Sequence, residues 1–298
     1  MNVHLLRALE PGPMALIDLR RAVGSPPQST MRVYSRALVE NGTMERQRQA
    51  AFPGTVEYAS AASGIALMGV GTVLETWLHQ SPEGPISLGS TASKSATKAL
   101  VEGWSSNIIR AIAAKPLSLT DLNRLIPRVS YPSLERRLGA LRLANLVEPH
   151  KGDGRGTPYR ATTWLRQAIV PLTAGAWWEH RYLIDPPIIS RLDIEAAFLL
   201  AIPSIDLPIT LTGTCRLAVE IQGGPSPVFA GVLIVVEAGR IISCSSRLEG
   251  EAGGWASGGT TSWMRRMNGT EGDLEIGGDA ELAREIIEGI RKNVIAKV

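Results

Sequence analysis

The apolar positions of residues 107–143 predict three short helices in succession. In the first segment, 107–114, isoleucines recur at the spacing of one helix face. The second segment, 118–126, places its leucines on one face and offers Ser118 or Thr120 as the N-cap. The pattern therefore begins with two helices that each have one face directed toward a core.

A turn at 127–132 separates these helices from a third, which begins at Ser133 and turns leucines inward at every third or fourth position. Beyond it, the extended stretches 146–148 and 158–162 flank a glycine-rich tip, which is typical of a two-stranded hairpin. Two helices, a turn, a third helix and a hairpin together predict a winged helix.

The same pattern occurs earlier in the chain, because residues 6–48 repeat residues 109–151 at a constant offset of 103. Identical pairs include Arg7 with Arg110, Ala8 with Ala111, Leu16 with Leu119, Asp18 with Asp121 and Leu19 with Leu122. Each hairpin leads into an apolar helix that ends in tryptophan, at Trp77 in the first copy and at Trp177 and Trp178 in the second. Two copies of one small domain follow each other.

From residue 188 the pattern changes to a helix followed by β-rich runs. The helix is expected over 188–202, and the predicted strands are 214–222, 228–237 and 240–246, with a tight hairpin at 237–240. A short helix within 258–269 and a short strand within 273–278 come next, and Asp279 is expected to cap a last helix over 280–297.

The predicted fold class is α+β, with two tandem winged-helix domains and a C-terminal α+β domain. The expected ranges are 1–80 and 100–184 for the two winged helices, 81–99 for a linker, and 185–298 for the C-terminal domain. The linker is rich in Ser, Gly, Ala and Thr, with a helical end left open. A chain of 298 residues suits two or three domains.

Composition points to a globular protein, with 44% hydrophobic and 20% charged residues. The most apolar run, 198–211, contains two prolines and Asp206, and the N-terminus shows no secretion signal, so we expect no membrane span and a cytoplasmic location. Residues 1–184 carry 21 Lys and Arg against 13 Asp and Glu, or +8, whereas 185–298 carry 10 against 15, or −5. A basic repeated half weakly favours a nucleic-acid partner.

The two repeats resemble the HxlR-type winged-helix transcription regulators. The residues that carry this resemblance are LLRAL, DLRRAV and FPGTVEYASAASGIAL in the first copy and WSSNIIRAIAAKPLSLTDLNRLIPRVSYPSLERRLGALRLANLVEP in the second. It covers about 3–78 and 104–183, and it implies binding of double-stranded DNA. Such regulators usually dimerise, so the chain is expected to be a monomer with an intramolecular pseudo-dimer, or a homodimer.

The C-terminal domain, from about residue 190, resembles the sterol-carrier-protein-like fold, on the phrases GGTTSWMRRMNG and GDLEIGGDAELAREII. This resemblance implies a shelter for an apolar ligand, and hence a hydrophobic small-molecule effector. The apolar side chains available for the pocket are Phe229, Leu233, Val235, Trp255, Trp263, Met264 and Met267. Each of them equally suits the core of a small domain, although Trp255 lies in a glycine-rich stretch that is expected to be flexible.

Recognition of DNA needs donors on the exposed face of a helix and cations that meet phosphates. The candidates in the first copy are Gln28, Thr30, Arg32, Val33 and Arg36 on the third helix, with Arg46 and Arg48 in the wing. The candidates in the second copy are Tyr131, Ser133, Arg136 and Arg137 on the helix, with His150, Lys151 and Arg155 in the wing. The alternative is that these arginines only solvate amphipathic helices. The weaker charge of the helix in the first copy makes that copy the one expected to have lost DNA contact.

Enzyme signatures are poor, so the sequence predicts no catalytic residues, metal site or cofactor. The histidines are scattered at positions 4, 79, 150 and 180, and no nucleophile elbow or phosphate loop appears. The two cysteines, Cys215 and Cys244, are expected to be buried free thiols rather than a disulfide. Glu249 and Glu251 are more typical of solvated charge than of catalysis.

The sequence therefore predicts a DNA-binding transcription regulator controlled by a hydrophobic small molecule. An alternative is a sequestration or resistance protein that captures such a compound and uses the winged helices as scaffold. An enzyme acting on nucleic acid or lipid is the third hypothesis.

Overall fold

The computed structural model describes residues 2–48, 54–101, 105–151, 156–221 and 227–295. Contacts divide the chain into two units, and each unit draws on two stretches of sequence. The first comprises Met1–Thr76 and Pro171–Pro187, and the second comprises Trp77–Val170 and Ile188–Val298. These units cut across the predicted domain ranges, because two long helices each begin in one unit and end in the other. The fold is mixed α+β.

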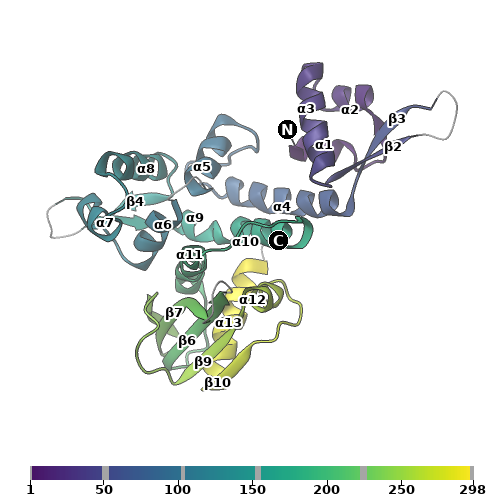
Figure 1. The fold of residues 1–298 in the computed structure, drawn as a ribbon. Helices are drawn as coiled ribbons and strands as arrows, with labels where there is room; N and C mark the ends of the chain where they lie inside the picture. The colour runs from purple at the N-terminus through teal and green to yellow at the C-terminus, as the bar shows by residue number, and fades with distance from the viewer. Residues whose placement is uncertain (1, 49–53, 102–104, 152–155, 222–226, 296–298) are drawn as a thin grey trace. The chain divides into compact units, whose positions relative to one another are not determined.

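The first unit begins with three helices and a small sheet (Figure 1). Its elements in chain order are α1 (Asn2–Ala8), β1 (Met14–Ala15), α2 (Leu16–Ala22), α3 (Gln28–Glu40), β2 (Met44–Arg48), β3 (Val56–Ser60) and α4 (Ala62–His79), which ends in the second unit. The three strands are antiparallel in the order β1-β3-β2. Strand β1, which the sequence did not predict, pairs with β3 beside the predicted hairpin.

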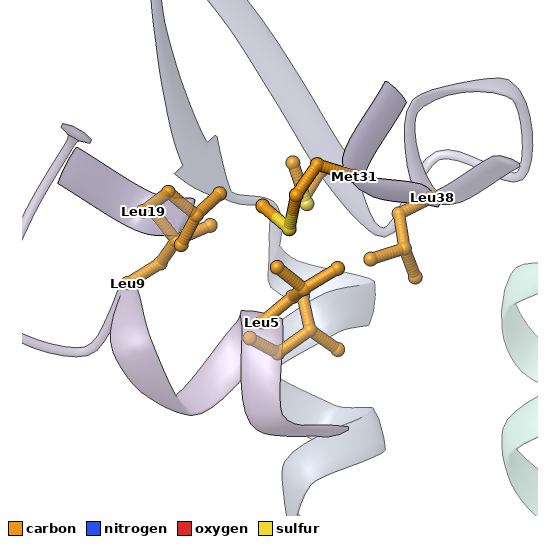
Figure 2. Close-up of a cluster of buried hydrophobic side chains, with 7 residues drawn as sticks. Leu5, Leu9, Leu19, Met31 and Leu38 are labelled. Carbon is orange, nitrogen blue, oxygen red and sulfur yellow. The ribbon is translucent and has the colours of Figure 1, made fainter. Parts of the chain in front are cut away.

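One cluster of buried side chains holds α1, α2 and α3 together (Figure 2). Its members are Leu5, Leu6, Leu9, Leu19, Met31, Leu38 and Met44. Burying a leucine or methionine side chain contributes about 1.5–3 kcal/mol relative to exposure, so this cluster is the main source of stability for the three helices. A bidentate ion pair from Arg7 to Glu75 then ties α1 to α4.

Helix α10 (Ile169–Tyr182) enters the first unit at Pro171. There the indole of Trp178 is buried and donates a hydrogen bond of 2.7 Å to the backbone carbonyl of Ser63, at the start of α4. The ring of Tyr182 lies 6.0 Å from that of Trp178. A helix from the second repeat is thus part of the core around the first.

The second unit contains the predicted second set of helices and hairpin. These elements are α6 (Ser105–Ala114), α7 (Leu119–Leu125), α8 (Tyr131–Leu143), β4 (Val147–Pro149), β5 (Tyr159–Ala161) and α9 (Thr163–Gln167). They follow each other in the same order as α1 to α4 of the first unit. Helix α8 begins at Tyr131 rather than at the predicted Ser133, because Pro132 falls in its first turn, where its missing N–H leaves no hydrogen bond unmade.

The helical end of the predicted linker is helix α5 (Thr91–Val101). Its Ala96, Ala99 and Leu100 are buried, and the helix contacts α6 and α8. Residues 91–99 are therefore packed within the second unit and are not a free connection.

The C-terminal part of the second unit is a five-stranded sheet with helices on one face. The elements are α11 (Arg191–Ala201), a 3-10 turn (Ile202–Ser204), β6 (Gly213–Ile221), β7 (Val228–Glu237), β8 (Arg240–Ser245), β9 (Gly254–Gly259), α12 (Thr260–Met267), β10 (Glu275–Gly278) and α13 (Ala280–Ile295). The strand order is β10-β9-β6-β7-β8, and β6 and β9 are parallel. Helices α11 and α13 cover the face formed by alternate residues of β6 and β7, including Leu217 and Val232.

Two local predictions in this domain are confirmed and one is wrong. Ala238 and Gly239 both have positive φ values, of 46° and 74°, so the β7–β8 connection is a two-residue hairpin turn. Asp279 accepts a hydrogen bond from the backbone N–H of Leu282 and caps α13. The prediction of a flexible stretch around Trp255 is wrong, because residues 254–259 form strand β9 between β6 and β10.

Helix α11 links the two parts of the second unit, since it contacts α6 on one side and β7 on the other. Its side chains are buried almost all round, at Ile194, Glu195, Ala196 and Phe198–Ala201. Such a helix belongs to the core on both sides.

Candidate nucleic-acid interface and ligand-binding face

Helix α3 turns one side to the core and a polar stripe to solvent. Met31, Ser35 and Leu38 are buried, whereas Gln28, Arg32 and Arg36 are exposed. The three polar residues lie four apart, so they form one stripe along the helix. A helix of 13 residues is about 20 Å long, and its width suits the major groove of DNA.

Arg36 is held in place by Glu40, one turn further along α3, with 2.7 Å between Nε and Oε1. This hydrogen bond to Glu40 raises the pKa of the Arg36 guanidinium. Both side chains are exposed, so the pair contributes little to stability.

The remaining candidates of the first copy lie beside this stripe or in the wing. Thr30 is half-buried in the first turn of α3. Arg46 and Arg48 are exposed on β2 and, two residues apart, point to the same side of the strand. The wing tip at 49–53 lies outside the described residues.

The corresponding stripe of α8 carries no cation. The repeat offset of 103 places Tyr131, Glu135 and Gly139 at the positions of Gln28, Arg32 and Arg36, and the ring of Tyr131 is exposed. Arg136 is exposed on a neighbouring face, and Arg137 is half-buried and already engaged in a contact. The two helices therefore present different chemistry to solvent.

Ser133 and the wing complete the second copy. The hydroxyl of Ser130 donates to that of Ser133 over 2.9 Å, just before and within the first turn of α8. Lys151 is exposed and His150 is half-buried beyond the end of β4, while Arg155 lies outside the described residues. Among the described residues at this wing tip, Lys151 is therefore the exposed cation that the structure places.

Helix α7, which precedes α8, begins with a reciprocal cap. The side chain of Ser118 accepts from the backbone N–H of Asp121, and the Asp121 carboxylate accepts from the N–H and hydroxyl of Ser118. These hydrogen bonds lower the pKa of Asp121 below its usual value. Ser118 is therefore the N-cap, out of the two residues that the sequence offered.

The ligand candidates divide between the core and the sheet face that α11 and α13 leave uncovered. Phe229, Leu233, Val235 and Trp255 share that face, because they occupy alternate, matching positions of β7 and β9 around β6. Phe229 is 41% exposed and Trp255 is 36% exposed. The ring of Trp255 lies over Gly277 on β10, where a β-carbon would come within 2.5 Å of the ring.

Trp263 is a core residue and not part of that face. Its indole N–H donates to the backbone carbonyl of Ala218 over 2.9 Å, and its ring meets the edge of Phe198 on α11 at 5.3 Å. Met264 and Met267 are half-buried on the same short helix, α12.

Arg216 is a residue of the sheet face that the sequence analysis did not single out. It lies on β6 directly between Leu233 of β7 and Trp255 of β9. Its Nη2 donates to the carbonyl of Gly250 over 2.5 Å, whereas its Nε is buried without a hydrogen-bond partner among the described residues. The sequence could have pointed to Arg216, because it is the one cation in the otherwise mainly apolar predicted strand 214–222.

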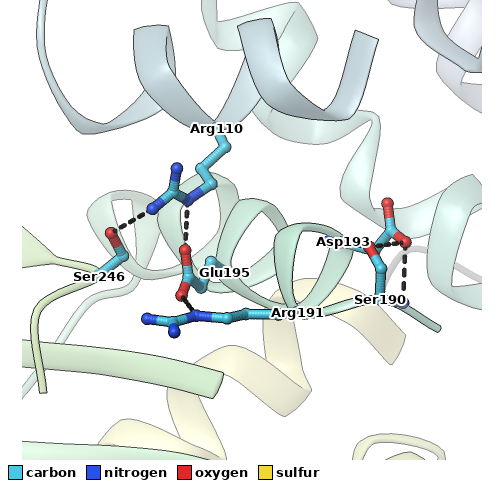
Figure 3. Close-up of polar contacts among 6 residues, drawn as sticks. All are labelled: Arg110, Ser190, Arg191, Asp193, Glu195 and Ser246. Carbon is cyan, nitrogen blue, oxygen red and sulfur yellow. Dashed lines mark hydrogen bonds and ion pairs between the residues drawn. The ribbon is translucent and has the colours of Figure 1, made fainter. Parts of the chain in front are cut away.

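A second group that the sequence analysis missed connects α6 to α11 (Figure 3). Glu195 of α11 is fully buried and accepts from Arg110 of α6 and from Arg191 of its own helix, the latter over 2.6 Å. Arg110 also donates to the hydroxyl of Ser246, beyond β8, over 3.2 Å. Glu195 therefore joins α11 to α6, and Arg110 continues this network to the segment after β8.

The remaining titratable groups offer little chemistry. Cys215 and Cys244 are free, and burial raises the pKa of each thiol to about 12, so both are protonated at neutral pH and poor nucleophiles. Within the described residues, no group of three or more His, Cys, Asp or Glu side chains is placed to hold a metal ion. The described helices are each too short or too polar to cross a membrane.

Comparison with known proteins gives one family. Residues 2–84 match the model of the HxlR-like helix-turn-helix family, and this range contains α1 to α4 with the exposed stripe of α3. The search of curated proteins finds no match. The N-terminal part of the chain is therefore similar to the HxlR-like helix-turn-helix family, and this family suggests a DNA-binding transcription regulator.

Proposed function

We propose that the protein is a transcription regulator that presents two winged-helix heads from one chain and responds to an apolar small molecule. The observation that carries the DNA-binding role is the exposed stripe of Gln28, Arg32 and Arg36 on α3, inside the region that matches the HxlR-like family. Glutamine and arginine are side chains that read adenine and guanine edges in the major groove.

The first head is the better DNA reader in this proposal, although the overall charge of the two helices favours the second. For base recognition, the net charge of a helix matters less than where its cations lie. The stripe of α3 carries two arginines at the positions where that of α8 carries Glu135 and Gly139. Arg46 and Arg48 in the first wing supply phosphate contacts, which set affinity and salt dependence. On the second head, Tyr131, Ser133, Arg136 and Lys151 remain available for a different half-site.

Two equivalent hydrogen bonds, each donated by a tryptophan indole to a backbone carbonyl, support an internal pseudo-dimer. Trp77 and Trp178 are 101 residues apart, as are Ser63 and Trp164. In the second unit Trp77 donates to the carbonyl of Trp164 over 2.9 Å, and in the first unit Trp178 donates to that of Ser63 over 2.7 Å. Each repeat thus donates one tryptophan hydrogen bond to the other, and the two accepting carbonyls occupy equivalent positions. Such reciprocal contacts are typical of an interface between two identical partners.

The Trp77 bond is reinforced within the second unit. The indole of Trp164 donates back to the carbonyl of Trp77 over 2.8 Å, and the two rings stack 4.4 Å apart at 8°. Stacked aromatic rings contribute about 0.5–1.5 kcal/mol beyond their burial. In this proposal the pair of heads is completed within one chain.

Control by a ligand is proposed because α11 is shared between the sheet domain and the helices of the second repeat. A ligand shifts DNA binding only if it binds the competent and incompetent arrangements with different affinities. A change at the sheet reaches α6 through Glu195 and Arg110 without a further connecting element.

Selection from a pool of random duplexes tests this proposal. We expect the full-length protein to enrich one sequence with two unlike half-sites, because α3 and α8 expose different residues. Arg32→Ala should relax the sequence of one half-site only. A pool that stays random after repeated rounds would contradict the proposal.

The second candidate function is sequestration of a hydrophobic compound, and the exposure of Phe229 and Trp255 on one sheet face favours it. Exposed apolar side chains that gather on one face often mark a binding site. Sequestration predicts tight ligand binding with no enriched DNA sequence, so the same selection separates the two functions.

A further inference from the structure

The sheet face that α11 and α13 leave uncovered combines apolar side chains with one guanidinium. Arg216 sits at the centre of the sheet, on the strand between β7 and β9, and its cross-strand neighbours are Leu233 and Trp255. Val235 and Phe229 continue the apolar surface along β7.

The Nε of Arg216 is a buried donor that the described part of the chain leaves without an acceptor. A guanidinium has five N–H groups, and the described residues supply one partner, the carbonyl of Gly250. Buried polar atoms in native proteins nearly always have a partner, and a bound ligand or an ordered water can supply the acceptor that this Nε lacks. No carboxylate of the described residues pairs with Arg216.

We propose that this face binds an amphipathic ligand with a carboxylate head group, which Arg216 receives. This inference rests on the proposed ligand control and names the chemical class of the effector. A carboxylate matches the forked N–H groups of arginine in two parallel hydrogen bonds. An apolar body then covers Leu233, Val235 and Trp255.

The acidic residues around the site disfavour a polyanionic ligand. Glu220 and Glu275 lie on the same face of the sheet, and Glu249 and Glu251 flank Gly250, and all four are exposed. Their carboxylates repel a polyanion such as a nucleic acid, whereas a single carboxylate at Arg216 is neutralised. The site is thus chemically distinct from the DNA-binding stripe on α3.

The segment after β8 gives the ligand a route to the helices. Gly250 accepts from Arg216, and Ser246, four residues earlier, accepts from Arg110 of α6. A ligand carboxylate competes with Gly250 for the same guanidinium and releases this segment at one end. The other end is bonded to α6, the first helix of the second winged-helix pattern.

Titration of the full-length protein with dodecanoate and with dodecan-1-ol tests the site, since the two probes share a chain and differ in charge. Binding is followed by calorimetry and by tryptophan fluorescence, below the concentrations at which either probe aggregates. We expect dodecanoate to bind at least about tenfold more tightly, corresponding to about 1.4 kcal/mol. Arg216→Met should remove this preference, and Arg216→Lys, which keeps the charge, should retain part of it.

Arg240→Met is the matched control, because Arg240 is an exposed arginine at the start of β8. It removes the same charge and should leave the preference unchanged. Equal affinity for acid and alcohol, binding of neither probe, or an Arg216→Met protein that keeps the preference would overturn the inference.

Specific DNA binding, measured on the same samples without a probe, separates this inference from the function on which it rests. If an operator is bound specifically and the acid is not preferred, only the carboxylate site is wrong. If the acid is preferred and no operator is bound, the site stands and the regulatory function fails.

Discussion

At the scale of single residues, the proposed DNA binding depends on which side chains of α3 point away from the core. Met31 and Leu38 anchor the helix in the cluster of Figure 2. This packing directs Arg32 away from the core, where its side chain is exposed. The position of the cation is therefore set by hydrophobic packing. Removing the cation should affect DNA binding without affecting the fold.

Arg32→Ala should weaken binding to the selected duplex by roughly 5- to 150-fold, corresponding to about 1–3 kcal/mol for a lost base contact. Fluorescence anisotropy at fixed salt measures the change. Arg240→Ala removes the same charge from an exposed position of the sheet domain and serves as control. A similar loss in both variants would show that only net charge matters.

Asp121 gives a prediction in pH. Hydrogen bonds from Ser118 lower its pKa in the folded state, so its carboxylate stabilises the fold above the unfolded pKa of about 3.9. The contribution is lost as the pH falls through the lower, folded value. We expect Asp121→Ala to have a lower Tm than the unmodified protein at pH 6, with the gap closing in stronger acid.

Asp18 is the matched control, because it occupies the same position of the first repeat, where Ala15 is the N-cap of α2 and no side-chain cap forms. Asp18→Ala should change Tm little at any pH. A gap between Asp121→Ala and the unmodified protein that persists at the lowest pH would contradict the capping role.

At the scale of elements, α11 is the connection between the sheet and the helices of the second repeat. Its buried Glu195 is held by two arginines that are each partly exposed (Figure 3). Removing the negative charge of Glu195 leaves Arg110 without its ionic partner at a buried contact. Loss of one partner from a buried ion pair lowers the free energy of unfolding strongly.

Glu195→Gln should lower the free energy of unfolding by about 3 kcal/mol, as measured by urea denaturation. Glu148→Gln breaks an exposed pair with Arg160 on the β4–β5 hairpin and should cost less than about 0.5 kcal/mol. If the two variants lose the same stability, Glu195 does not connect the parts of the second unit.

Local patterns allowed the sequence to predict most of these elements. The leucines at 134, 138 and 141 mark α8, the Ala238-Gly239 turn separates β7 from β8, and Asp279 begins α13. Strand β9 was missed because its glycine-rich sequence has no alternating pattern. Its backbone pairs with β6, which lies more than 30 residues earlier in the sequence, and with β10, which follows after helix α12.

The candidate sites were predictable only where they lie on one element. The stripe of α3 follows from helical spacing, and the shared face of Leu233 and Val235 follows from strand alternation. The roles of Arg216 and Glu195 depend on partners 34 and 85 residues away in the chain, so no local pattern marks them. Burial of Trp263 against Phe198 is likewise a long-range contact.

At the scale of the whole molecule, the proposed function has one chain carry the two DNA-binding heads that two identical chains otherwise supply. The hydrogen bonds that the indoles of Trp77 and Trp178 donate, each to a carbonyl of the other repeat, lie within this one chain. If α3 and α8 both read DNA, as we propose, their unlike exposed residues remove the need for a palindromic operator.

We therefore expect one chain of 32.0 kDa to bind one operator. Light scattering of the free protein and of its complex with a selected duplex measures the number of chains. A complex with two chains on one duplex would show that the heads act through a homodimer.

The most direct test of the central claim is the affinity of the purified protein for the DNA upstream of its own gene, compared with random duplexes of equal length across a salt series. The account predicts a preference of about a thousandfold or more, with affinity falling steeply and linearly on logarithmic axes as salt rises. Equal and weak binding to both duplexes would contradict a specific regulator and leave capture of a small molecule as the function.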